Sequence, residues 1–179
     1  MKFHIIKYTV GLVLLFIQCE TFTGQNLKSL KGNKFTDEIL STVLFTTSGE
    51  KTSLGKVIEE LNGNAVLVDF WASWCKTCAR EMEYSKKLQD EFKKKKITFL
   101  FLSTDTDYKQ WLLGLGRIDI DGRHYRIDEP SKKKIKEYFK IKGIPYYILL
   151  DKEGYIFDPK ASWPHQETLK NEIDLLLSL

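Results

Sequence analysis

The sequence predicts a single α/β domain in which helices flank a central mixed β-sheet. Two continuous apolar segments, residues 64–72 and 97–105, have the pattern of buried strands, and the segment between them has helical spacing. Strand, helix and strand in this order form a parallel crossover unit. A strand, turn and strand over residues 144–161 add antiparallel pairing. A length of 179 residues suits one such domain with a sizeable core.

Composition and charge exclude several classes of protein. Apolar residues make up 42% of the chain and charged residues 29%, which is ordinary for a folded protein and argues against a disordered chain or a membrane bundle. The lysine runs at 93–96 and 132–134 come without an aromatic or glycine-rich nucleic-acid motif. We therefore interpret them as solvated helix ends and expect no nucleic-acid partner.

The first 24 residues have the layout of a secretory signal peptide. Two lysines precede an apolar run at residues 10–17, which is shorter than the ~20 residues that a membrane-spanning helix needs. Removal of residues 1–24 takes away two lysines and one glutamate, so the formal charge falls from +4 to +3. Cys19 leaves a second interpretation open, a lipoprotein signal, and only then would the protein be attached to a membrane. The expected location is periplasmic or otherwise extracytoplasmic.

The polar residues 25–34 are expected to form a linker, and residues 35–179 to form the domain. A strand around 42–46, a turn at 48–50 and a return toward Leu54 predict a β-hairpin extension at the amino end. Apolar residues at helical spacing then predict a helix over 57–61, before the strand at 64–72.

Beyond the first crossover the sequence predicts a short helix around Trp111 and an irregular stretch up to Asp128, interpreted as an insertion. Its polar and aromatic side chains are candidates for a substrate-recognising surface, with ordinary loop packing as the alternative: Arg117, Arg123, His124, Tyr125 and Arg126. A helix over 131–143 with Ser131 as its cap and a final helix over 165–179 complete the elements.

Two of the three cysteines, Cys75 and Cys78, stand one helical turn apart directly after the strand at 64–72. A zinc site needs about four ligands, and the isolated histidines of this domain do not supply them. A structural disulfide across so short a loop would stabilise the fold little. A redox pair is the interpretation that we favour. Unpaired N–H groups at a helix amino end favour a Cys75 thiolate, which attacks a disulfide, and Cys78 then displaces the product.

The segment VDFWASWCKTC at residues 68–78 resembles the active-site motif of thioredoxins. The order of elements from Phe35 onward is similar to the extracytoplasmic TlpA/ResA-like thioredoxin family, with FLSTD, GIPYYILLDKEG and PKASWP as further matching segments. The resemblance implies a thioredoxin-like fold and an enzyme that exchanges thiols and disulfides without a cofactor or metal. It also implies a cis proline at Pro145, which faces the disulfide and keeps metal ions from the thiols.

Residues beside the cysteines take expected roles from the same resemblance. Asp69 matches the buried acid behind the thioredoxin cysteines, and such a carboxyl suits a proton shuttle to Cys78; an Asp that caps a loop is the alternative. The backbone of Ile144 is expected to pair with an extended substrate. Trp74 is expected to shield the thiolate edge, while Trp71 packs beneath it, although a purely structural role is open for both.

The functional expectation is an exported reductase of protein disulfides that a membrane electron donor recharges. The sequence departs from the family at Lys76 and Thr77, because most relatives place a proline before the second cysteine. The direction of the reaction therefore stays open. An oxidase or isomerase that uses the same pair, and a non-catalytic thioredoxin-fold binding module, are the alternatives.

Overall fold

The computed structural model describes residues 30–179. The expected export segment, Cys19 and the first part of the expected linker lie outside these residues. The elements are, in chain order, α1 (Asp37–Leu40), β1 (Val43–Phe45), β2 (Lys51–Ser53), α2 (Leu54–Glu60), β3 (Ala65–Trp71), α3 (Lys76–Phe92), β4 (Ile97–Ser103), α4 (Tyr108–Ile118), β5 (Arg123–Ile127), α5 (Glu129–Tyr138), β6 (Tyr146–Leu150), β7 (Ile156–Asp158) and α6 (Glu167–Leu177).

The strands form one seven-stranded mixed sheet in the order β2-β1-β5-β4-β3-β6-β7. Strand β4 pairs in parallel with β3 and β5, whereas β6 pairs antiparallel with β3 and β7. The expected hairpin of β1 and β2 joins the sheet through antiparallel pairing of β1 with β5. The predicted mixed α/β fold is thus confirmed, and the cysteines follow the carboxyl end of β3, which lies near the middle of the sheet.

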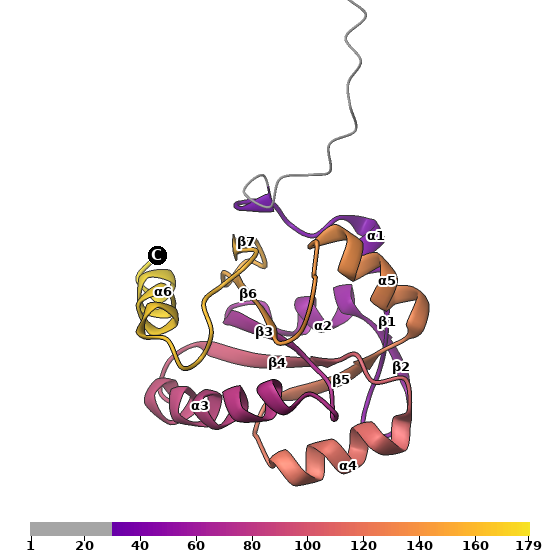
Figure 1. The fold of residues 1–179 in the computed structure, drawn as a ribbon. Coiled ribbons are helices and arrows are strands. Elements are labelled where there is room, and N and C mark those ends of the chain that lie inside the picture. The colour runs from indigo at the N-terminus through magenta and orange to yellow at the C-terminus, as the bar shows by residue number, and fades with distance from the viewer. Residues whose placement is uncertain (1–29) are drawn as a thin grey trace, which may run out of the picture.

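Helices cover both faces of the sheet, as Figure 1 shows, with α3 and α4 on one side and α1, α2 and α5 on the other. Every residue of β3 is buried, because alternate side chains enter the two layers. Val66, Val68 and Phe70 pack in one cluster, and Leu67 and Trp71 pack in the other, which α3, α4 and α6 cover. Of the helices in residues 30–179, none has the length and apolarity that crossing a membrane requires.

Part of the segment expected to be a linker packs against the domain. Leu30 is buried in the core cluster that α1 and α2 cover. The Gly32 N–H donates to the Ile156 carbonyl at 2.7 Å, and the Ile156 N–H donates to the Asn33 carbonyl at 2.8 Å. Residues 30–33 therefore pack against the domain.

The helix expected around Trp111 is confirmed as α4, but the irregular insertion expected after it, up to Asp128, is wrong, because β5 is an interior strand of the sheet. The Tyr125 side chain is buried in the core, and the His124 ring stacks on Phe101 at 4.9 Å. Arg126 covers the Phe45 ring at 4.7 Å, and Arg123 pairs with Glu60 at 2.7 Å. These side chains cover neighbouring strands and helices and are not gathered into one recognition surface; Arg117, on α4, is apart from them.

The helix cap expected at Ser131 lies at Asp128, whose carboxylate accepts a hydrogen bond from the Ser131 N–H at 2.8 Å. Ser131 lies within the first turn of α5, and its hydroxyl accepts from the Val43 N–H at 2.8 Å. Ser131 therefore ties α5 to the edge of β1, and the preceding aspartate satisfies the free end of the helix.

Helix α4 touches the active-site loop at Gly114. A Cβ atom at this position would lie 2.6 Å from Cβ of Ser73, whereas a Cβ at Gly116 would meet nothing within 4 Å. We expect Gly114→Ala to lower the free energy of unfolding by about 1–2 kcal/mol through overpacking. Gly116→Ala, on the same helix, should raise it by about 0.5–1 kcal/mol through helix propensity. Urea denaturation of both variants checks this; equal stability would show that the contact with Ser73 is unimportant.

Candidate active site

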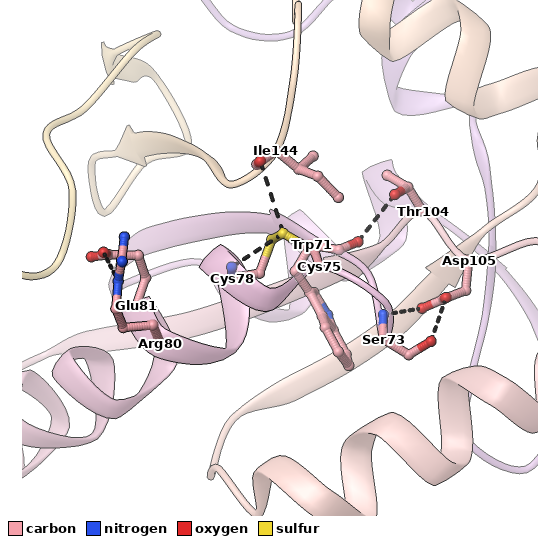
Figure 2. Close-up of a disulfide and its surroundings, with 9 residues drawn as sticks. All are labelled: Trp71, Ser73, Cys75, Cys78, Arg80, Glu81, Thr104, Asp105 and Ile144. Atoms are coloured by element: carbon pink, nitrogen blue, oxygen red, sulfur yellow. Dashed lines mark hydrogen bonds and ion pairs between the residues drawn. A yellow bond between two sulfur atoms is a disulfide. The ribbon is translucent and has the colours of Figure 1, made fainter.

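Cys75 and Cys78 lie where β3 passes into α3. Cys75 is the N-cap residue of α3, and Cys78 lies in its first turn. Their sulfur atoms form a disulfide with an S–S distance of 2.11 Å (Figure 2). The spacing of one helical turn thus brings both sulfurs together, as the sequence predicts, at the carboxyl edge of the sheet where ligands meet such folds.

A backbone donor points at the first sulfur. The Cys78 N–H donates to Sγ of Cys75 at 3.1 Å, and Figure 2 shows this contact at the start of α3. The first N–H groups of a helix have no partner within the helix, and the helix dipole places positive potential at the same point. After reduction of the disulfide, these groups favour a negative charge on the Cys75 sulfur.

The two sulfurs differ in access to solvent. Cys75 is 8% exposed and Cys78 is 1% exposed, so Cys75 is the more accessible residue of the pair. Trp74, immediately before it, is 69% exposed. On the other side, the Ile144 carbonyl oxygen lies 3.9 Å from Sγ of Cys75 (Figure 2), and the Ile144–Pro145 bond is cis, as expected.

The loop before the cysteines is fixed to the end of β4 by a buried aspartate that the sequence analysis did not single out. The Ser73 N–H and hydroxyl donate to the two carboxylate oxygens of Asp105 at 2.9 and 2.7 Å, as Figure 2 shows. The Ser103 hydroxyl donates to the same carboxylate at 2.7 Å. The Thr104 N–H donates to the Trp71 carbonyl at 2.8 Å. The segment FLSTD therefore holds the active-site loop in place.

Asp105→Ala is expected to lower the free energy of unfolding by about 3 kcal/mol, since it leaves buried hydroxyl and N–H donors without a charged acceptor. Asp107→Ala is the matched control: this neighbouring aspartate caps α4 by accepting from the Gln110 N–H, which contributes only about 1 kcal/mol. Urea denaturation of the oxidised protein measures both. An Asp105→Ala variant as stable as the control would contradict the anchoring role.

Asp69 lies in β3 on the side of the sheet that α3 covers, directly opposite Tyr147 of β6. The side chain is 2% exposed, and neither carboxylate oxygen has a hydrogen-bond partner among residues 30–179. Burial raises the pKa of the Asp69 carboxyl well above its usual range, and the negative charge of Glu81 raises it further. A carboxyl whose pKa is raised in this way is suited to hold or release a proton during a reaction.

Glu81 is the second buried acid, three residues after Cys78 in α3, and sequence reasoning missed it. Its side chain is 1% exposed, and Oε2 accepts hydrogen bonds from the His165 ring Nδ1 at 2.8 Å and from the His165 N–H at 3.3 Å. Arg80 Nε lies 3.7 Å from Oε1 (Figure 2). The signal in the sequence was a glutamate at an apolar position of α3, in line with Cys78 and Met82.

The predicted site residues differ in exposure. Trp74 and Ile144 line a cavity, whereas Asp69 is buried in β3, the strand that leads to the cysteines. Trp71 is fully buried and packs with both cysteines in the same core cluster, in line with its expected packing position.

Comparisons with known proteins agree with this geometry. Residues 63–156 match the model of a family described as thioredoxin-like. The thioredoxin-like protein YneN of Bacillus subtilis is 28% identical over 179 residues, which cover 94% of this chain and 98% of that protein. The thiol-disulfide oxidoreductase ResA of Bacillus thuringiensis is 29% identical over 107 residues. That match covers 58% of this chain and 60% of ResA.

Solved structures give the same result. The thioredoxin domain of a thiol-disulfide oxidoreductase from Bacteroides vulgatus superimposes with a TM-score of 0.65 at 27% identity, over 75% of this chain and 91% of that one. A thiol:disulfide interchange protein from Bacteroides sp. gives 0.64 at 26% identity, over 77% and 86% of the two chains. The fold of this chain thus has counterparts among solved thiol-disulfide oxidoreductases.

Proposed function

The chain belongs to the thioredoxin-like family and is a thiol-disulfide oxidoreductase, and we propose that it is exported and reduces protein disulfides through Cys75 and Cys78. One observation supports this proposal above the others. The more accessible cysteine, Cys75, is also the one whose sulfur faces the first N–H groups of α3, while Cys78 is more deeply buried one turn away.

The reaction proceeds in two exchanges. The Cys75 thiolate attacks one sulfur of a substrate disulfide, the S–S bond of the substrate breaks, and a mixed disulfide forms while the other substrate sulfur leaves as a thiolate. Cys78 then loses its proton and attacks Sγ of Cys75, which releases the second substrate thiolate. The substrate gains two electrons and two protons, and the enzyme ends with the Cys75–Cys78 disulfide seen in the structure.

Asp69 is proposed to accept the proton that Cys78 loses, through water. The raised pKa of its carboxyl and its burial in β3, the strand that leads to the cysteines, suit this role. Trp74, Ile144 and Pro145 are proposed to contact the substrate. The surface exposure of Trp74 and the Ile144 carbonyl beside Cys75 fit an extended segment that lies along the cis-proline loop.

Export and recharging belong to the same proposal. The signal-like residues 1–24 support a periplasmic or other extracytoplasmic location, where the surroundings reoxidise dithiols. A reductase in such a compartment needs a supply of electrons, for which a membrane electron donor is proposed. Attachment of the protein itself to the membrane requires lipidation of Cys19.

The redox potential of the Cys75–Cys78 pair tests whether the protein reduces or oxidises its substrates. We expect equilibration with glutathione or dithiothreitol buffers to place it near that of thioredoxin, about −270 mV, and the reduced protein to precipitate insulin. A potential near about −120 mV would instead identify an oxidase. Failure to exchange with insulin at all would leave a binding module.

A Cys78→Ala variant identifies the substrates. It can form the mixed disulfide but cannot resolve it, so substrate proteins should remain attached to Cys75 in cells and separate from it when dithiothreitol is added. The matched control is Cys75→Ala, which keeps only the buried cysteine and should trap nothing. Equal recovery from both variants would contradict the assignment of Cys75 as the attacking residue.

A further inference from the structure

A cavity of about 620 Å³ opens beside the disulfide, between α5 and the loop that carries the cis proline. Trp74 and Ile144 line it, so the cavity shares two residues with the active site. Because the Ile144 carbonyl lies 3.9 Å from Sγ of Cys75, a chain bound in the cavity needs only a short extension to place a sulfur at Cys75. None of the catalytic steps described for the cysteines uses this space.

The floor of the cavity is apolar. Phe70, Ile127, Ile135 and Ile141 line it, and all four side chains belong to the core. Pockets of about 300–1,000 Å³ hold small ligands, so this one has room for two or three residues of a peptide. An apolar side chain of a substrate would leave water on entering it, which favours binding.

The rim is positively charged. One acidic residue, Glu129, faces four lysines: Lys132, Lys133, Lys136 and Lys142. Lys132 pairs with Glu129 at 2.5 Å and also donates to the Thr104 carbonyl. Lys136 and Lys142 are exposed and have no ion-pair partner within residues 30–179. The rim therefore carries an excess of positive charge that a ligand can neutralise.

We propose that this cavity binds the polypeptide substrate through a short segment in which an apolar side chain lies next to acidic residues, close to the cysteine that is reduced. The apolar floor of the cavity binds the apolar side chain, and Lys136 and Lys142 face the acidic residues. The proposal rests on the proposed function and adds a substrate class to it. Each exposed lysine–carboxylate pair favours binding by only roughly twofold to fivefold, so the selectivity comes from several contacts together.

Matched synthetic peptides with one internal disulfide test the proposal. In the first peptide a leucine and two glutamates lie within three residues of one cysteine; in the others the glutamates are glutamines or lysines, or the leucine is serine. The full chain is reduced, freed of reductant and mixed with each peptide. We expect the acidic peptide to react at least fivefold faster than the glutamine peptide and faster still than the lysine peptide. Replacing leucine by serine should slow it severalfold.

A pair of double variants locates the effect. In Lys136→Gln/Lys142→Gln, the ratio of rates for the acidic and glutamine peptides should fall to about twofold or less. Lys94→Gln/Lys134→Gln removes the same net charge at exposed sites that do not line the cavity, and should keep the full ratio. In the unaltered protein the ratio should also shrink when the ionic strength rises from about 0.02 M to about 0.5 M.

The outcomes separate the two proposals. If the unaltered protein reduces none of the peptides, the proposed function fails. If it reduces all of them at the same rate, or if both double variants lose the ratio equally, the cavity is not the recognition site while the reductase function stands. Reduction of oxidised glutathione as fast as the acidic peptide would likewise overturn the proposal, because glutathione carries carboxylates without an apolar side chain.

Discussion

Cys75→Ser is expected to reduce the rate of insulin reduction by at least about a thousandfold, to the background of the assay. The hydroxyl of serine does not ionise near neutral pH and cannot form a mixed disulfide, so the first exchange does not occur. The remaining thiol of Cys78 cannot replace it, since that side chain is 1% exposed. The loss of activity therefore follows both from the missing Cys75 thiol and from the burial of Cys78.

The difference in exposure between Cys75 and Cys78 can also be tested by a measurement that does not depend on enzyme turnover. In Cys78→Ala the remaining Cys75 should react with iodoacetamide at least tenfold faster than Cys78 does in Cys75→Ser, because Cys75 is the more accessible residue and its sulfur faces the helix end. Mass spectrometry of the alkylated peptide gives both rates. Faster alkylation of Cys78 would reverse the order of the two cysteines in the mechanism.

Asp69→Asn is expected to slow the second exchange, in which Cys78 attacks, by about a hundredfold, because the amide cannot accept a proton. The first exchange should change little. Single-turnover kinetics separate the two steps, since the mixed disulfide should accumulate in the variant. If the variant resolves the mixed disulfide as fast as the unaltered protein, Asp69 is not the proton acceptor.

The same substitution should have a stability effect with a definite sign. The native pKa of Asp69 is raised by burial and by Glu81, so the unfolded chain loses this proton at lower pH than the native protein does. Ionisation therefore destabilises the native state as pH rises above about 4, by up to about 1.4 kcal/mol per pH unit until the native carboxyl also ionises.

Asp69→Asn removes this penalty, so its stability relative to the unaltered protein should increase between pH 4 and pH 8. Urea denaturation across that range gives the difference. Asp90→Asn, at an exposed position of α3, is the matched control for the loss of one carboxylate. A difference for Asp69→Asn that varies with pH no more than that of the control would mean that burial does not shift the Asp69 carboxyl.

The central elements of the fold could be predicted because their sequence patterns are strong. Continuous apolar runs specify β3 and β4, and the spacing of apolar residues specifies α3 and α6. Strand β5 was not predicted, because its segment, RHYRI, has polar residues at three of five positions although it lies in the interior of the sheet. His124 and Arg126 are accommodated there by lying over the rings of Phe101 and Phe45, which a pattern of apolar positions does not reveal.

The sequence predicts the part of the candidate site that neighbouring residues form, but not the contacts that residues from distant segments make with it. Cys75 and Cys78 are neighbours in sequence, so their juxtaposition follows from helix geometry. Asp105 and His165 act on this site from distant parts of the chain, and nothing near them in sequence indicates a contact with Ser73 or Glu81. The cavity beside the disulfide likewise forms only when α5 packs next to the cis-proline loop.

The proposed mechanism depends most on the ionisation of one thiol, Cys75, at the start of α3. Its alkylation rate by iodoacetamide, measured against pH for the folded reduced protein and for the same protein in urea, tests this directly. We expect the folded protein to reach half its maximal rate at least one pH unit below the unfolded chain, which should ionise near pH 8.5. The same midpoint in both states would show that the start of α3 does not stabilise the Cys75 thiolate.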